Sequence, residues 1–192
     1  MAQSLGFYTQ AELRTLGLAR ALQRNNAPAT LLHRYALRAT SADRFDVFLS
    51  HSYADATTIL GIVDLLEAQG LSVYVDWIVD HQLDRTKANR DTANTLRQRM
   101  RQCRSLVYAV STSSRSSIWM PWELGYFDGM GRQTRISIMP IEENTPGSKG
   151  QEYLDLYPAI EKVTDHGRAI TAAVEQRDRH YVSVREFALG IL

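Results

Sequence analysis

The sequence predicts an α/β fold in which helices cover both faces of a central parallel sheet. The first observation behind this prediction is that short apolar segments alternate with amphipathic helical segments over residues 44–141. The second is that these apolar segments have the length and composition of buried strands. The third is composition: a chain of 192 residues, 44% hydrophobic and 22% charged, can form one globular domain with a substantial core.

Residues 1–43 are predicted to form a helical N-terminal extension. Thr9 and Glu12 have the spacing of a capping box, in which hydroxyl and carboxylate satisfy free backbone N–H groups of the first helical turn. The apolar face that follows at helical spacing consists of Ala11, Leu18 and Leu22. We interpret the extension as a cap that packs on the main domain; the alternative is an oligomerisation or partner surface.

Residues 44–165 are predicted to form the domain core. Strands are expected over residues 45–50, 71–75, 105–110 and 136–141, with a further strand near Ile160. Helices are expected after Asp55, over residues 92–102 and over residues 117–129. Gly70 is expected to end the first of these helices in the left-handed conformation, just before the second strand.

Residues 166–192 are predicted to form C-terminal helices that pack on the core. The prediction rests on apolar residues at helical spacing, first Ile170 and Val174, then Val184, Phe187 and Ile191.

Composition excludes several classes of protein. A formal net charge of +1 excludes a protein that coats polyanions and an acidic disordered tail. The single cysteine, Cys103, cannot form an internal disulfide, and no cluster of Cys and His suggests a metal, so we expect a reducing compartment and no metal site. The sequence contains neither 18 consecutive apolar residues nor a secretory signal at its start, so we expect a cytoplasmic protein without a membrane partner.

Ligands of open parallel sheets bind at the carboxyl ends of the strands. One of the helices predicted to start there carries two indole rings and a carboxylate near its beginning. Trp119 and Glu123 are four residues apart and share a helix face, with Pro121 suited to the first turn and Trp122 next to the carboxylate. Two indole rings beside a fixed negative charge suit a cationic ring or one that becomes cationic during reaction. The alternative is that both Trp residues are core packing and that Glu123 complements the helix dipole.

Three segments of the chain resemble Toll/interleukin-1 receptor (TIR) domains. Residues 45–52, Phe-Asp-Val-Phe-Leu-Ser-His-Ser, are similar to the first box of the family, usually written YDVFISHS. Residues 70–76 resemble the second strand, which leads into the long BB loop, and residues 119–123 resemble the WxxxE segment of TIR domains that cleave NAD⁺. The order and spacing match over about residues 44–142, and single-domain bacterial proteins of this kind resemble the signal-producing subunit of Thoeris-type antiphage systems.

The resemblance implies a flavodoxin-like TIR fold and an NAD⁺ glycohydrolase or ADP-ribosyl cyclase-type enzyme. Glu123 then matches the catalytic glutamate, which would stabilise the ribosyl cation as nicotinamide departs. The substrate-binding residues implied by position are Phe45, Asp46, Ser50, His51, Trp77, Trp119 and Trp122. The BB loop departs from animal signalling TIRs because it lacks Arg-Asp-Pro-Gly, which argues against adaptor-type contacts through that motif.

NAD⁺ is expected as a consumed substrate rather than a bound cofactor, because no GxGxxG follows the first strand. The acceptor of the ribosyl cation stays open: water gives ADP-ribose, the adenine ring a cyclic isomer, and an added imidazole a histidine conjugate. The main alternative function is a non-catalytic TIR module for protein–protein interaction.

Charge is distributed unevenly along the chain. Residues 85–104 carry seven basic side chains and one acidic one, whereas residues 142–165 carry six acidic and two basic ones. Opposite charges suggest head-to-tail assembly of copies, so we expect a homo-oligomer, with a downstream effector that senses the product; two solvated faces are the alternative. The basic segment leaves nucleic-acid binding as a third hypothesis, although nucleic acid is not an expected partner.

Overall fold

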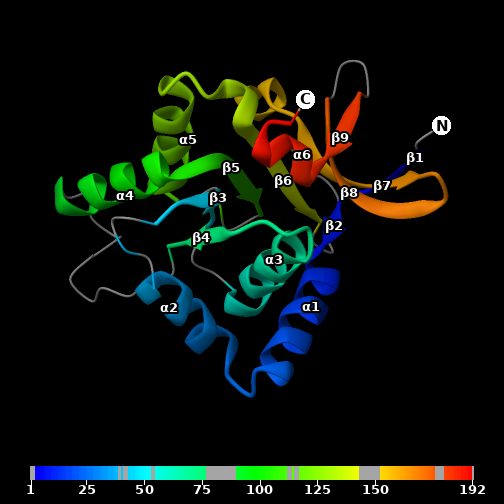
Figure 1. Ribbon diagram of the computed structural model, residues 1–192, viewed down its shortest axis with the longest axis horizontal. Coiled ribbons are helices and arrows are strands. Elements are labelled where there is room, and N and C mark those ends of the chain that lie inside the picture. Colours follow the sequence, from blue (N-terminus) through cyan, green and yellow to red (C-terminus); the bar gives the residue numbers. More distant parts are fainter. Residues whose placement is uncertain are drawn as a thin grey trace.

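A nine-stranded sheet forms the centre of the described chain (Figure 1). The computed structural model describes residues 3–38, 40, 43–52, 55–76, 90–111, 114, 117–142, 152–175 and 180–191. The main path of the sheet has the order β4-β3-β5-β6-β7-β8-β9. These strands are β3 (Phe45–Ser50), β4 (Val73–Val75), β5 (Cys103–Val110), β6 (Ile136–Glu142), β7 (Ala159–Asp165), β8 (Arg168–Val174) and β9 (Tyr181–Ser183). Pairing is parallel from β4 through β7, which confirms the predicted parallel sheet, and antiparallel from β7 to β9.

Helices cover both faces of the sheet, as predicted. Residues of α1 (Gln10–Gln23), α2 (Pro28–Arg38), α3 (Ala56–Ala68) and α6 (Val184–Leu189) share one cluster of buried side chains with the sheet. The other cluster contains residues of α4 (Arg90–Gln102) and α5 (Trp119–Gly129) together with Leu154 of the 3-10 helix η3 (Glu152–Leu156). Figure 1 shows α1 and α3 on one side of the strands and α4 and α5 on the other.

The N-terminal segment pairs with β6 and β7 where these two strands separate. Direct pairing of β6 with β7 is confined to Ile138 and Ala159, beyond which β1 (Gln3–Gly6) pairs with β7 and β2 (Tyr8–Thr9) pairs with the end of β6. The prediction of a purely helical extension is therefore wrong over these two strands. They form because the separated edges of β6 and β7 offer unpaired backbone groups, which the segment satisfies.

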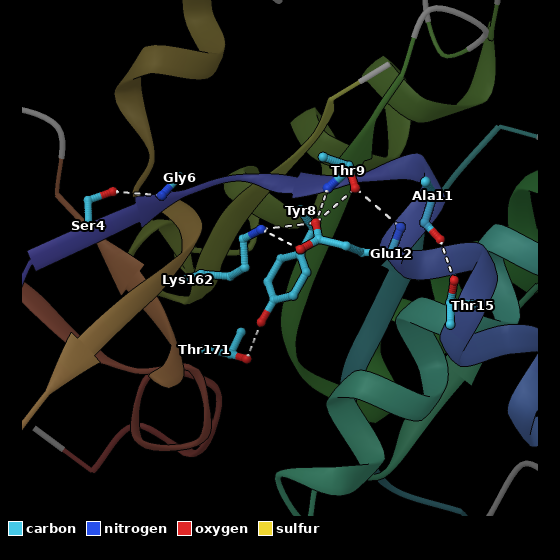
Figure 2. Close-up of polar contacts among 9 residues, drawn as sticks. All are labelled: Ser4, Gly6, Tyr8, Thr9, Ala11, Glu12, Thr15, Lys162 and Thr171. Carbon is cyan, nitrogen blue, oxygen red and sulfur yellow. Dashed lines mark hydrogen bonds and ion pairs between the residues drawn. The ribbon is translucent and has the colours of Figure 1, made fainter. Parts of the chain in front are cut away.

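Polar contacts hold this segment to β7 and β8 (Figure 2). The Tyr8 hydroxyl lies 2.7 Å from Thr171 Oγ1, and Lys162 Nζ donates to Glu12 Oε1 over 2.7 Å. Glu12 also completes the predicted capping box with Thr9, which confirms that prediction. Burial alone would raise the pKa of Glu12, but hydrogen bonds from Lys162 and Thr9 outweigh it and hold the pKa below its usual value.

Replacing Tyr8 by phenylalanine should lower the free energy of unfolding by about 1–3 kcal/mol, because the buried Thr171 hydroxyl loses its partner. Replacing Thr171 by valine as well removes both polar groups, so the double variant should regain much of the loss. Urea unfolding of the two single variants and the double variant measures this. A double variant as unstable as the sum of the singles would contradict the argument.

The buried face of α1 differs from the predicted one. Its buried residues are Leu13, Gly17 and Ala21, whereas Leu18 is 50% exposed and Leu22 is 82% exposed. The helix packs against α3 through its smallest residues, with Gly17 beside Gly61, so that the two backbones come into direct contact. The packed face therefore combines Leu13 with two small residues, and the leucines of the predicted face, Leu18 and Leu22, lie outside it.

The prediction of a helix carrying Ile170 and Val174 is wrong, because both residues lie on β8. Ile170 and Val174 are four residues apart, a separation that places two side chains on one face of either a helix or a strand. The chain reverses between β7 and β8 through His166 and Gly167, both with positive φ, which is the two-residue turn favoured between antiparallel strands. The second predicted helix is confirmed as α6, which begins with a capping box formed by Ser183 and Glu186.

Candidate active site

A buried carboxylate and a serine hydroxyl meet at the carboxyl ends of the central strands. Ser50 is the last residue of β3, and Glu123 lies on α5, which covers this face of the sheet. The Ser50 hydroxyl donates to Glu123 Oε2 over 2.6 Å, and both residues are 1% exposed. The structure thus brings together the end of the first box and the glutamate of the WxxxE segment, which are 73 residues apart in the sequence.

The start of α5 positions Glu123. Ser117 Oγ accepts a hydrogen bond from the Met120 backbone N–H over 3.2 Å and so caps the first turn. Pro121 lies within that turn, where its missing N–H costs no hydrogen bond.

The two Trp side chains of the motif have different surroundings. Trp119 is buried, and its ring meets that of Trp122 edge-on, with centroids 5.5 Å apart. Trp122 stacks on Tyr126 at 5.6 Å, and the guanidinium of Arg97 from α4 lies 5.2 Å from the Trp122 ring. Trp122 therefore contributes to the contact between α4 and α5, and Trp119 is the indole that lies deeper in the core.

His51 follows Ser50 at the same edge of the sheet. It is 4% exposed, and its Nδ1 lies 3.3 Å from the carbonyl oxygen of Ser52. His51 is thus buried just beyond the end of β3, next in sequence to Ser50.

Two other predicted substrate-binding residues lie at the opposite end of β3. Asp46 Oδ2 accepts hydrogen bonds from the backbone N–H and the hydroxyl of Ser72, and the Phe45 ring packs against Tyr74. The structure does not bring Phe45 or Asp46 to Glu123. Trp77, the remaining predicted residue, lies outside the described residues.

Sequence reasoning missed a tyrosine at this site. Tyr108 on β5 is the register partner of Ser50 and is 3% exposed. Burial raises the pKa of Tyr108 strongly, and the neighbouring Tyr153 and the charge of Glu123 raise it further. No sequence signal joins Tyr108 to Ser50, because only the pairing of β3 with β5 places them side by side.

The acidic segment does not form one free surface within its described residues. Glu161 is buried and accepts from the Ser4 hydroxyl, Lys162 pairs with Glu12, and Asp165 accepts from the Tyr181 hydroxyl. The basic residues of α4 instead lie on aromatic rings, Arg97 and Arg101 over Tyr126 and Arg99 over Tyr74. Much of the charge in both segments is therefore used in contacts within the chain.

Among the residues that the structure describes, no three His, Cys, Asp or Glu side chains are grouped so as to hold a metal ion. Within the same residues, no helix combines the length and the apolar character that crossing a membrane requires.

Fold and site together define an α/β domain that holds a buried glutamate beside the carboxyl ends of its parallel strands. Residues 47–171 match the family described as TIR domain, and the chain belongs to that family. This confirms the resemblance found in the sequence.

Two named relatives support the assignment. A Bacillus cereus (strain MSX-D12) protein named "Probable 3' cyclic ADP-D-ribose synthase ThsB'" is 51% identical over 122 residues, which are 62% of each chain. A Cytobacillus dafuensis protein, TIR2, which is named provisionally as a cyclic ADP-D-ribose synthase, is 33% identical over 89 residues. Those residues are 46% of this chain and 24% of TIR2, so the matches span less than two thirds of either relative.

Proposed function

We propose that this protein cleaves the nicotinamide–ribose bond of NAD⁺ and closes the ADP-ribose part into a cyclic signal molecule. The observation that carries the proposal is the buried Glu123 carboxylate, held by the Ser50 hydroxyl at the ligand-binding edge of the sheet. The names of the two relatives, both cyclic ADP-ribose synthases, support the cyclic product over ADP-ribose or a histidine conjugate.

The chemistry needs an anion more than a proton donor. When the bond between the ribose carbon and nicotinamide breaks, its electron pair leaves with neutral nicotinamide, and the ribose becomes an oxocarbenium ion. A carboxylate in a water-poor site stabilises this cation because its charge is little screened. A nucleophile of the ADP-ribose part then forms the new bond and releases a proton, so the products are nicotinamide, the cyclic nucleotide and H⁺.

Purified protein incubated with NAD⁺, with products identified by mass spectrometry and chromatography, tests the proposal. Nicotinamide and a cyclic product of the same mass as cyclic ADP-ribose are expected in equal amounts. If no nicotinamide appears, even after addition of infected-cell lysate, the protein acts as an interaction module instead.

The resemblance to Thoeris-type systems supports a role in antiphage defence, with an effector protein that senses the product. Assembly of copies belongs to the same proposal, since TIR domains often complete their sites between neighbouring molecules. Size-exclusion chromatography with light scattering, with and without NAD⁺, measures the assembly.

Replacing Ser50 by alanine should lower turnover about tenfold, because Glu123 loses a charge-assisted hydrogen bond that fixes its orientation. The matched control is Ser105→Ala, since Ser105 is equally buried on the neighbouring strand but donates to the backbone oxygen of Asp46, at the other end of β3. Initial rates of nicotinamide release measure both variants. Equal rates for Ser50→Ala and Ser105→Ala would remove Ser50 from the site.

A further inference from the structure

Two arginines and two aromatic rings meet where α4 and α5 lie next to each other, and we call these four residues the arginine–aromatic patch. The guanidinium groups of Arg97 and Arg101 on α4 lie 6.0 and 5.9 Å from the ring centre of Tyr126 on α5. Trp122 stacks on Tyr126, and Arg97 lies 5.2 Å from the Trp122 ring. Arg101 is exposed and the other three side chains are partly buried, so the patch reaches the protein surface.

The two guanidinium groups of the patch are not neutralised by a carboxylate in the part of the chain that the structure describes. Arg97 donates to the side-chain oxygen of Asn94 over 3.0 Å, which uses one of its five N–H groups. A guanidinium that contacts a ring through its flat face keeps its N–H edge available for hydrogen bonds. Arg99 of the same helix differs, because it donates to the carbonyl oxygen of Thr40.

The acidic residues of the two helices lie away from the patch. Asp91 is in the first turn of α4, whereas Arg97 and Arg101 are in its second half. On α5, Glu123 is buried, and Asp128 is two residues beyond Tyr126, a spacing at which helical side chains do not face each other. The patch is therefore a positively charged surface.

The surface beside the rings is open to a partner. Gly125 and Gly129 of α5 are exposed, and a Cβ on either residue would meet nothing within 4 Å. Another chain can therefore approach α5 closely next to Tyr126.

Residue types and spacing indicate what such a partner carries. Trp, Tyr and Arg are the residues most enriched among those that dominate the energy of protein–protein interfaces. Arg97 and Arg101 are one helical turn apart, so two carboxylates about 6 Å from each other can each receive paired N–H bonds from one guanidinium. Glutamates four residues apart on a helix have this separation.

We propose that the arginine–aromatic patch binds an acidic helical segment of a partner protein through two carboxylates one turn apart. The proposal does not depend on the cleavage of NAD⁺. It concerns a surface of α5 and α4 and assigns the basic segment of the sequence a partner.

Two other occupants match the patch less well. Single-stranded nucleic acid stacks its bases on aromatic rings, but both rings here are already in contact with guanidinium groups and with each other. A second copy of the chain would need a pair of unpaired carboxylates on a helix. Among the described α-helices, the carboxylates one turn apart are Asp64 and Glu67, and both are paired with Arg20.

The test uses a short alanine-based helical peptide that carries two glutamates four residues apart, and a matched peptide with glutamine at both positions. Fluorescence anisotropy of the labelled peptides measures their affinity for the full chain. We expect the glutamate peptide to bind about tenfold more tightly at low salt, and added salt to reduce the difference. Replacing Arg97 and Arg101 together by glutamine should abolish the difference. Replacing both by lysine keeps the charge but not the paired N–H groups, so it should preserve only part of it.

The matched control replaces Arg34 of α2 and Arg168 of β8 by glutamine, which removes the same charge from two exposed arginines elsewhere. It should change the affinity by less than about twofold. Circular dichroism checks that each double variant is folded.

Four results would overturn the proposal. Glutamate and glutamine peptides that bind alike would exclude recognition of carboxylates. A control variant that weakens binding as much as the patch variant would show that net charge alone attracts the peptide. A single-stranded oligonucleotide that binds through the patch when the glutamate peptide does not would assign the patch to nucleic acid. Self-association that is lost in the Arg97 and Arg101 double variant, in place of peptide binding, would assign it to a second copy.

Discussion

Replacing Glu123 by glutamine is expected to reduce nicotinamide release from NAD⁺ by a factor on the order of 10² or more. Glutamine has nearly the same size, and its carbonyl oxygen can still accept the hydrogen bond from Ser50, so the fold should be preserved. What disappears is the negative charge that, in the proposed reaction, stabilises the ribosyl cation from a buried position. Binding of NAD⁺ before cleavage should change little, because the cation has not yet formed.

The matched control is Glu161→Gln, which makes the same chemical change at another buried carboxylate. Glu161 is 3% exposed on β7 and accepts from the Ser4 hydroxyl, in the contact between the sheet and the N-terminal strand. It should retain wild-type turnover even if its stability falls. A folded Glu123→Gln protein that releases nicotinamide as fast as Glu161→Gln would end the catalytic assignment.

Much of the fold was predictable because its core strands and helices have recognisable patterns of apolar residues. The strands at residues 45–50, 105–110 and 136–141 are short apolar runs, and burial on both faces of the sheet is what such runs indicate. Gly70 has φ of 75° at the end of α3, as the prediction of a left-handed cap requires. In these segments local preference and tertiary packing agree.

Other elements depend on contacts that no local pattern shows. The segment Gln3–Gly6 is polar and mostly exposed, and it becomes a strand only because β6 and β7 separate and leave edges to pair with. Residues 168–174 have apolar positions compatible with both periods, and the turn at His166 and Gly167 was the signal that favoured a strand.

The candidate site was predictable where a motif ends at the carboxyl edge of the sheet, and not elsewhere. Phe45 and Ser50 are the two ends of β3, and a strand rises about 3.3 Å per residue, so they are roughly 16 Å apart. Only the Ser50 end can reach Glu123, which is why the structure does not bring Phe45 and Asp46 to the carboxylate. Tyr108 lies beside Ser50 because β5 pairs with β3, which is a tertiary feature that no local pattern shows.

Replacing Gly61 by alanine is expected to lower the free energy of unfolding by about 3 kcal/mol. A Cβ at Gly61 would lie 1.9 Å from the backbone oxygen of Leu13, and one at Gly17 would lie 2.0 Å from that of Thr57. The obstacle is backbone of the facing helix, so no side chain can rotate to make room, and α1 must move away by roughly 1 Å. Alanine gains about 1 kcal/mol of helix propensity over glycine, which is too little to offset this separation.

Gly125→Ala on α5 is the control, because a Cβ there meets nothing within 4 Å and the helix propensity should slightly increase stability. Urea unfolding compares the two variants, and a Gly61→Ala protein as stable as Gly125→Ala would show that the helices do not touch in solution. The change should also weaken activity. Arg14 of α1 pairs at 2.8 Å with Asp55, whose carboxylate caps α3 a few residues after Ser50, so a displaced α1 loosens the edge of the sheet that holds the candidate site.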